Sequence, residues 1–412
     1  MSFRIKVTLM SIAVSSAITS VTFAEMKPLQ QSSSVTLSSL TQQVYERHPA
    51  RHNELAQQQQ INANNDLADA TFAGVKRISL NHQNDVLGSS DGLQEWESTV
   101  KMPLWLPGQQ KQQRSLSVSL SAQLPAYKQQ IRLAASAKVR ELVWDVILTN
   151  TATKQAYQVW QSALRLEQDV AARVKAGELA GTERLLAKTN VLEMKNQYLL
   201  KKSELDFSLS TYRAITQQQL LPEMYQEILS DNYMIDQQHP LLMMMEQHIN
   251  TLRAKQNLAH FDGAVNTSLS VGVRRERQLY GESFNNSLGL GISFALDNQV
   301  YRQPAIADAA KELADAEITR QQLERTLNVT LFSRLHDLET KRLQMGLLNQ
   351  QNDTTQQYLI LQQRAFALGE LNLVSLLRSQ ALANETINHK LALEVDIKHT
   401  IALINQALGI IL

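Results

Sequence analysis

The chain has 412 residues and a formal net charge of +1, and 43% of its residues are hydrophobic. A nucleic-acid-binding surface needs lysine and arginine gathered on one face, whereas basic and acidic residues are mixed along this chain, so no nucleic-acid partner is expected. Cysteine is absent, which excludes disulfide bonds, cysteine-ligated metals and a lipid attached to an N-terminal cysteine.

The first 24 residues have the pattern of a secretory signal peptide. Arg4 and Lys6 precede an apolar run over residues 7–21, and small residues lead up to Ala24. The run is short compared with the roughly 20 residues of a membrane-spanning helix, so we expect cleavage after Ala24 rather than retention as an anchor. No second long apolar run follows in the sequence, and a membrane-inserted part would therefore have to consist of β-strands.

The rest of the chain is predicted to be an internal duplication. Three landmarks recur at a spacing of 191 or 192 residues: His48-Pro49 and His239-Pro240, the strand ends near Leu104 and Leu296, and the turns Gly177-Glu178-Leu179 and Gly369-Glu370-Leu371. A nearly constant spacing across three kinds of feature indicates one architecture used twice. We expect a first repeat over residues 25–215, a linker over 216–238 and a second repeat over 239–412.

Each repeat contains two segments with the period-two alternation of β-strands. They cover residues 77–85 and 94–104 in the first repeat, and 265–274 and 287–296 in the second. Polar, turn-prone residues separate the members of each pair, which predicts two hairpins. Half-buried hairpins packed on helices would show the same alternation, but lengths of about ten residues match tilted membrane-spanning strands.

The hairpins are followed by very long helices. From Leu313 onward, apolar residues fall three or four apart, as in an amphipathic helix with a coiled-coil seam. A helix over residues 304–367 would be about 95 Å long at 1.5 Å per residue. Its counterpart over 109–175 is ambiguous at its start, because Leu116 and Val118 alternate with serines like a third strand, and Pro125 predicts a kink or break. The repeat partner lacks this alternation and favours a helix. Opening helices are expected over 36–73 and 241–258.

Two motifs resemble the outer membrane factor family typified by TolC. The sequence MPLWLPG at 102–108 is similar to the family's junction between strand and long helix, and RAFALGELNLVSLLRSQ at 364–380 is similar to the helical hairpin at its periplasmic tip. The resemblance implies a mainly α fold with a small β part. Three chains would form a long antiparallel α-helical barrel and share one transmembrane β-barrel with four strands from each chain.

The family resemblance also implies a function. The protein would be the outer-membrane exit duct of a tripartite efflux or type I secretion-like system, contacting outer-membrane lipid, a periplasmic adaptor protein and an inner-membrane pump. The resemblance implies a homotrimer, and physical reasoning supports oligomerisation independently, because four strands cannot close a barrel and open edges in hydrocarbon leave backbone groups unpaired. The alternative is a non-pore periplasmic coiled-coil adaptor or structural protein, against which the alternating hairpins argue.

By the same resemblance, the two helical turns would form the closed periplasmic entrance. The expected adaptor-contacting turn residues are Gly177, Glu178, Gly369 and Glu370, and the candidate gate residues are Glu183, Arg184, Ser375 and Arg378. Relatives often carry acidic residues where this chain has Ser375 and Arg378. A ring of arginines would repel cations and favour anions. The simpler interpretations are helix capping for the glycines and helix-surface charge for the others.

No residue pattern indicates catalysis, so neither enzymatic activity nor a cofactor or metal is expected. His48 and His52 stand four apart on a predicted helix, which permits a shared ligand, but a solvated or interface pair is the simpler interpretation. Met243, Met244 and Met245 could bind copper through their thioethers or, more simply, pack in a core. The sequence has no phosphate-binding glycine loop and no activated-serine motif.

Overall fold

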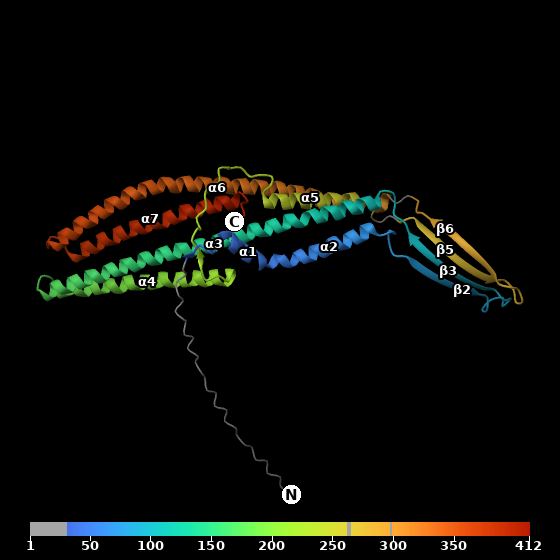
Figure 1. Ribbon diagram of the computed structural model, residues 1–412, viewed down its shortest axis with the longest axis horizontal. Helices are drawn as coiled ribbons and strands as arrows, with labels where there is room; N and C mark the ends of the chain where they lie inside the picture. The colour runs from blue at the N-terminus through green and yellow to red at the C-terminus, as the bar shows by residue number, and fades with distance from the viewer. Residues whose placement is uncertain (1–30, 262–264, 297–298) are drawn as a thin grey trace, which may run out of the picture.

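The computed structural model describes residues 31–261, 265–296 and 299–412. Long helices form a rod, a small β-sheet extends from one end of it, and two tight helical turns lie at the other end (Figure 1). The predicted signal peptide, residues 1–24, lies outside the described residues.

From α2 and from α5 onward, the two halves of the chain follow the same order of elements: a helix, two strands and two long helices. The first half contains β1 (Gln31–Ser32), α1 (Leu37–Glu46), the short 3-10 helix η1 (Pro49–Arg51), α2 (His52–Asp69), β2 (Arg77–Asn84), β3 (Gln94–Pro103), α3 (Gln109–Lys175) and α4 (Gly181–Thr216). After β4 (Leu221–Pro222), the second half contains α5 (Pro240–Ala259), β5 (Ser268–Arg277), β6 (Asn285–Ser293), α6 (Gln299–Ala367) and α7 (Leu373–Ala407). The expected long antiparallel helices and four antiparallel strands are therefore confirmed.

The single opening helix expected over residues 36–73 is wrong. It is divided into α1 and α2 by η1, and α2 already ends at Asp69. The break occurs at His48, whose backbone is extended (φ −65°, ψ 127°) because the following Pro49 disfavours the helical conformation. The imidazole Nδ1 of His48 then accepts a hydrogen bond from the backbone N–H of Ala50 at 3.2 Å. His239 caps α5 in the same way, accepting from Leu241 N–H at 3.2 Å.

The first long helix is already helical at its start, where the sequence fits either a strand or a helix. Leu116, Leu120 and Leu124 lie four residues apart on one side of α3 and pack against Ile61 of α2 and Ala254 of α5. Val118, which suggested a strand, points to the outside of the helix and is 69% exposed. Pro125 lies within α3 and does not break it. Packing of the neighbouring helix surface therefore outweighs the one backbone hydrogen bond that proline removes.

The four long strands form one antiparallel sheet in the order β2-β3-β5-β6. The two predicted hairpins are joined through β3 and β5, in a register that places Val100 opposite Val271. Strands β2 and β6 are the two edges of this sheet.

The main core lies near the middle of the rod. Residues of α1, α3, α4 and α7 pack there, including the fully buried Leu40, Val139, Tyr212 and Ala402. The linker between the halves crosses this level, and its Glu227 receives two hydrogen bonds, at 2.8 and 2.7 Å, from the buried guanidinium of Arg140. None of the helices in the described ranges combines the length and apolar character needed to cross a membrane.

Candidate functional site

The two helical turns at the end of the rod have the same backbone geometry. Gly177 and Gly369 have φ values of +82° and +78°, in the left-handed region that favours glycine. Glu178 N–H bonds to Arg173 O and Glu370 N–H bonds to Ala365 O, each at 2.9 Å, as in a Schellman helix end. These turns therefore end α3 and α6 identically, at positions 192 residues apart.

An apolar cluster joins the two tips within one chain. Its buried members come from all four long helices: Val170, Ala187, Phe366, Leu373 and Leu376. The hairpin of α3 and α4 is thereby packed against the hairpin of α6 and α7 beside the turns. Separating the two hairpins here would expose this cluster to water, which costs free energy.

Arg173 adds a polar link across the same boundary. Its Nη1 donates to the backbone carbonyl of Phe366 at 3.0 Å, and its Nε donates to the Glu178 carboxylate at 3.1 Å. The guanidinium lies 5.0 Å from the centre of the Phe366 ring. Sequence reasoning missed this contact. The available signal was a departure from the repeat, since the position equivalent to Arg173 is occupied by Ala365.

The predicted tip residues occupy different environments. Glu178 contacts Arg173, whereas Glu370 is exposed. Glu183, in the first turn of α4, has a buried Oε2 without a hydrogen-bond partner, and the neighbouring Arg184 is exposed. The backbone N–H of Ser375 donates to the side chain of Asn372, which caps α7, at 2.9 Å.

Arg378 lies in a groove between α4 and α7. The groove has a volume of about 290 Å³ and also contains Glu193 of α4. Glu183 and Arg184 do not line it, so the structure brings Arg378 together with a carboxylate other than the one considered from the sequence. Ser375 is one turn before Arg378 but is likewise not part of the groove wall.

This groove continues along α7 toward the middle of the rod. A second part, of about 640 Å³, shares Glu193 and Ala381 with the first and is bounded by α3, α4 and α7. A third part, of about 720 Å³, shares Leu148 and His389 with the second and reaches α6. We call these three connected parts the inter-hairpin groove.

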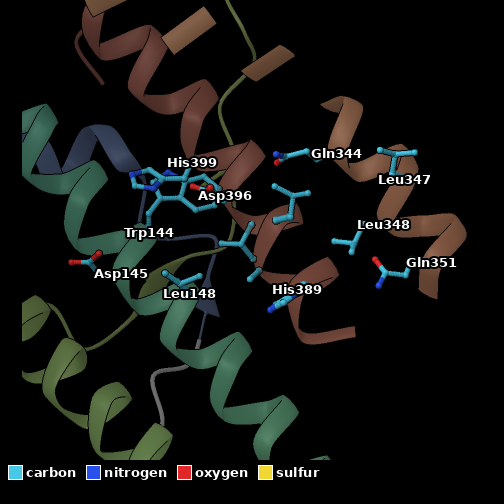
Figure 2. Close-up of a pocket in the computed structure, with 13 residues that line it drawn as sticks. Trp144, Asp145, Leu148, Gln344, Leu347, Leu348, Gln351, His389, Asp396 and His399 are labelled. Atoms are coloured by element: carbon cyan, nitrogen blue, oxygen red, sulfur yellow. The ribbon is translucent and has the colours of Figure 1, made fainter. Parts of the chain in front are cut away.

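The third part of the inter-hairpin groove has an aromatic floor (Figure 2). Trp144 stacks on His399 with ring centres 5.7 Å apart. Burial lowers the pKa of His399, against the opposing effect of nearby Asp396 and Asp145. Burial likewise raises the pKa of Asp145, and Glu141 adds to the increase. Asp396 forms an ion pair with Lys341, whose Nζ lies 2.8 Å from Asp396 Oδ2.

No group of three or more histidine and carboxylate side chains suited to a metal is present among the residues that the structure describes. His48 uses its Nδ1 to cap η1, as described above, and so does not share a ligand with His52 through that atom. Met245 packs beside a buried cluster that contains Ile249 and Leu252.

The sheet has two chemically different faces. The apolar sheet face is formed by alternate residues of all four strands: Ile78, Leu80, Val100, Met102, Leu269, Val271, Val273, Leu288, Leu290 and Ile292. The polar sheet face carries the residues between them, including Glu97, Lys101 and Arg274. In the single chain Leu80 is 78% exposed, Leu290 74% and Ile292 67%. Such a large exposed apolar surface marks a contact with a partner or with lipid.

Solved structures of outer membrane proteins share this fold. The outer membrane protein VceC from Vibrio cholerae aligns over 90% of this chain and 96% of its own, with a TM-score of 0.71 and 11% identity. The CmeC outer membrane channel of Campylobacter jejuni aligns over 99% and 94%, with a TM-score of 0.67 and 12% identity. The MtrE outer membrane channel of Neisseria gonorrhoeae aligns over 90% and 88%, with a TM-score of 0.65 and 12% identity.

No protein-family model and no curated protein matches the sequence. The similarity to these outer membrane proteins is therefore one of structure, and it extends over about nine-tenths of the chain. As the two sequence motifs predict, the chain has the fold of the TolC-like outer membrane channels.

Proposed function

We propose that this chain is the outer-membrane exit duct of a tripartite efflux or type I secretion-like system. The observation that carries the proposal is the apolar sheet face, with strands of eight to ten residues at the end of a long helical rod. These strand lengths fit a tilted transmembrane β-strand. The fold shared with outer membrane channels supports the same placement in the Gram-negative cell envelope.

The sheet edges support assembly as a homotrimer. Among the strands that the structure describes, β2 and β6 each have a strand partner on one side only. Unpaired backbone groups are costly in hydrocarbon, so β2 of one chain would pair with β6 of the next until the ring closes. The apolar sheet face would then contact lipid, and the polar sheet face would line the lumen.

The opposite end of the molecule suits contact with other envelope proteins. We assign the adaptor contact to the turn residues Gly177, Glu178, Gly369 and Glu370. The inter-hairpin groove provides apolar helical surface beside these turns, as a partner made of helical hairpins would require. An inner-membrane pump would then supply energy and choose the substrate.

Passage through the duct would be passive and controlled at the tips. The gate would open by movement of one helical hairpin against the other, with no chemical step. Candidate gate residues are Glu183, Arg184, Ser375 and Arg378, together with Arg173, whose hydrogen bond to the Phe366 carbonyl joins the two hairpins.

Purification of the mature chain from outer membranes tests the proposal. We expect a detergent-stable trimer that produces ion conductance in planar bilayers. A chain that is monomeric without detergent and never conducts would contradict the duct. A membrane-bridging protein that binds a pump but forms no conductance would instead support the adaptor alternative.

A further inference from the structure

The apolar sheet face ends in two arginines on the side of the hairpin turns. Arg275 lies opposite Trp96 and Arg277 lies opposite Gln94 in the pairing of β3 with β5. Because strand side chains alternate, both arginines project from the same face as Val271 and Val273. The hairpin turns lie at the end of the sheet farthest from the helices (Figure 1). The apolar band is therefore followed directly by cationic side chains at that end.

The guanidinium groups of these two arginines contact aromatic rings. The guanidinium carbon of Arg275 lies 4.5 Å from the centre of the Phe284 ring, and that of Arg277 lies 5.0 Å from the same centre. Arg277 also lies 5.5 Å from the centre of the Tyr280 ring. A guanidinium resting on an aromatic face keeps its N–H donors available at the ring edge for another partner.

The neighbouring pair, β2 and β3, adds aromatic side chains beside these arginines. His82 is paired with Trp96, and their rings stack with centres 3.9 Å apart. One row across the sheet thus reads His82, Trp96, Arg275 and Asn286. Aromatic residues of this kind are enriched where the apolar band of a membrane β-barrel meets the headgroup layer.

The charges on the two sheet faces are balanced differently. Arg274, on the polar sheet face, is paired with Glu95 and with Glu276, each at 2.7 Å. Within the described ranges, Arg275 and Arg277 form no ion pair. Two positive charges on the apolar sheet face are therefore left for an external anion.

We propose that Arg275 and Arg277, beside Trp96 and His82, bind the phosphate of an anionic lipid headgroup in the outer leaflet. This inference rests on the proposed function, because the face contacts lipid only when the sheet forms part of a membrane barrel. Guanidinium matches phosphate through paired N–H donors. A lipid phosphate lies immediately beyond the hydrocarbon layer, which is where these arginines follow the apolar band.

Lipid selectivity of the full-length chain tests the proposal. Wild-type protein is reconstituted in phosphatidylcholine vesicles with either spin-labelled phosphatidic acid or spin-labelled phosphatidylcholine, and the motionally restricted fraction of each label is measured. We expect a preference for phosphatidic acid of about fivefold for each of the two arginines near the charged headgroup. The double variant Arg275→Gln/Arg277→Gln should bring the two lipids close to parity.

Arg274→Gln is the matched control, since it removes the adjacent positive charge from the opposite face. It should keep the full preference. Equal loss in Arg274→Gln would overturn the site in favour of general attraction, and so would displacement of the labelled lipid by millimolar inorganic phosphate.

Conductance and trimer formation are recorded on the same vesicles. Variants and wild type that conduct equally but show no lipid preference would overturn the phosphate site and leave the duct intact. A wild-type chain that does not insert would contradict both proposals.

Discussion

Arg173 is the clearest single residue that holds the two tips together. Its hydrogen bond to the Phe366 carbonyl crosses between the hairpins, and a hydrogen bond from a charged group typically contributes about 1.5–3 kcal/mol. Arg173→Gln should therefore loosen the closed tips and increase conductance in planar bilayers. The exposed Lys175, at the end of the same helix, provides the control, and Lys175→Gln should have a smaller effect. An equal effect of Lys175→Gln would remove Arg173 from the gate.

Arg378 is expected to influence which ions pass. It is exposed within the inter-hairpin groove near the tips, where a fixed positive charge disfavours cations. Arg378→Asp should shift the reversal potential in a salt gradient toward cation selectivity, and Arg378→Gln should shift it by a smaller amount in the same direction. Identical reversal potentials in all three proteins would show that Arg378 lies outside the constriction.

His239 makes the stability of the folded protein fall as the pH falls. The pKa of His239 is lowered below its usual 6.5 because the side chain is buried. The folded protein thus binds fewer protons than the unfolded chain, and the stability that this group contributes is complete above pH 6.5 and lost as the pH falls below it. Thermal unfolding between about pH 7.5 and 5 should show this loss.

Asparagine at this position keeps a side-chain acceptor for the Leu241 N–H but does not titrate. His239→Asn should therefore weaken the dependence of unfolding on pH. His48→Asn makes the same exchange at the equivalent, more exposed cap and controls for the loss of a capping imidazole. An unaltered pH profile in His239→Asn would assign the acid sensitivity to other groups.

At the scale of elements, the tip turns depend on two glycines with left-handed backbone. A side chain at Gly177 or Gly369 would meet no atom within 4 Å, so the cost of substitution is conformational alone. Gly177→Ala and Gly369→Ala should each destabilise the turn by about 1 kcal/mol. Gly181, which starts α4 in open space without a positive φ, is the matched position, and Gly181→Ala should be neutral in thermal unfolding.

The elements that the sequence predicts well are those whose side-chain pattern fits one structure only. In β6 and the first half of β5, apolar residues alternate with serine and glycine, which fits a strand and not a helix. Leu116, Val118 and Leu120 fit either a strand or a helix, and tertiary packing decides for the helix through contacts with α2 and α5. The split between α1 and α2 was foreseeable, because Pro49 restricts the residue before it.

For the whole molecule, placement in a membrane depends on the side of the sheet that faces lipid. Leu288→Lys puts a charge on the apolar sheet face, where lysine costs up to about 2–4 kcal/mol at the bilayer midplane and less near its surface. We expect less trimer in the outer-membrane fraction. Ser287→Lys places the same charge on the polar sheet face and should assemble normally. Equal assembly of both variants would argue against a lipid-facing sheet.

Contacts between the halves are the part that the sequence does not reveal. Arg173 and Phe366 are 193 residues apart, and Arg140 and Glu227 are 87 residues apart. In each case, periodicity assigns the residue to a helix face but does not identify its partner. The repeat itself predicts the two turns but not Arg173, because Ala365 occupies the equivalent position.

The unpaired strand edges have a genetic consequence. If β2 of each subunit must pair with β6 of the next, a single copy with a damaged edge leaves a seam open in any ring that includes it. With equal synthesis of intact and damaged chains, only about one ring in eight would contain three intact copies. An allele with a defective edge strand should therefore behave as dominant over the normal gene, whereas a simple deletion should be recessive.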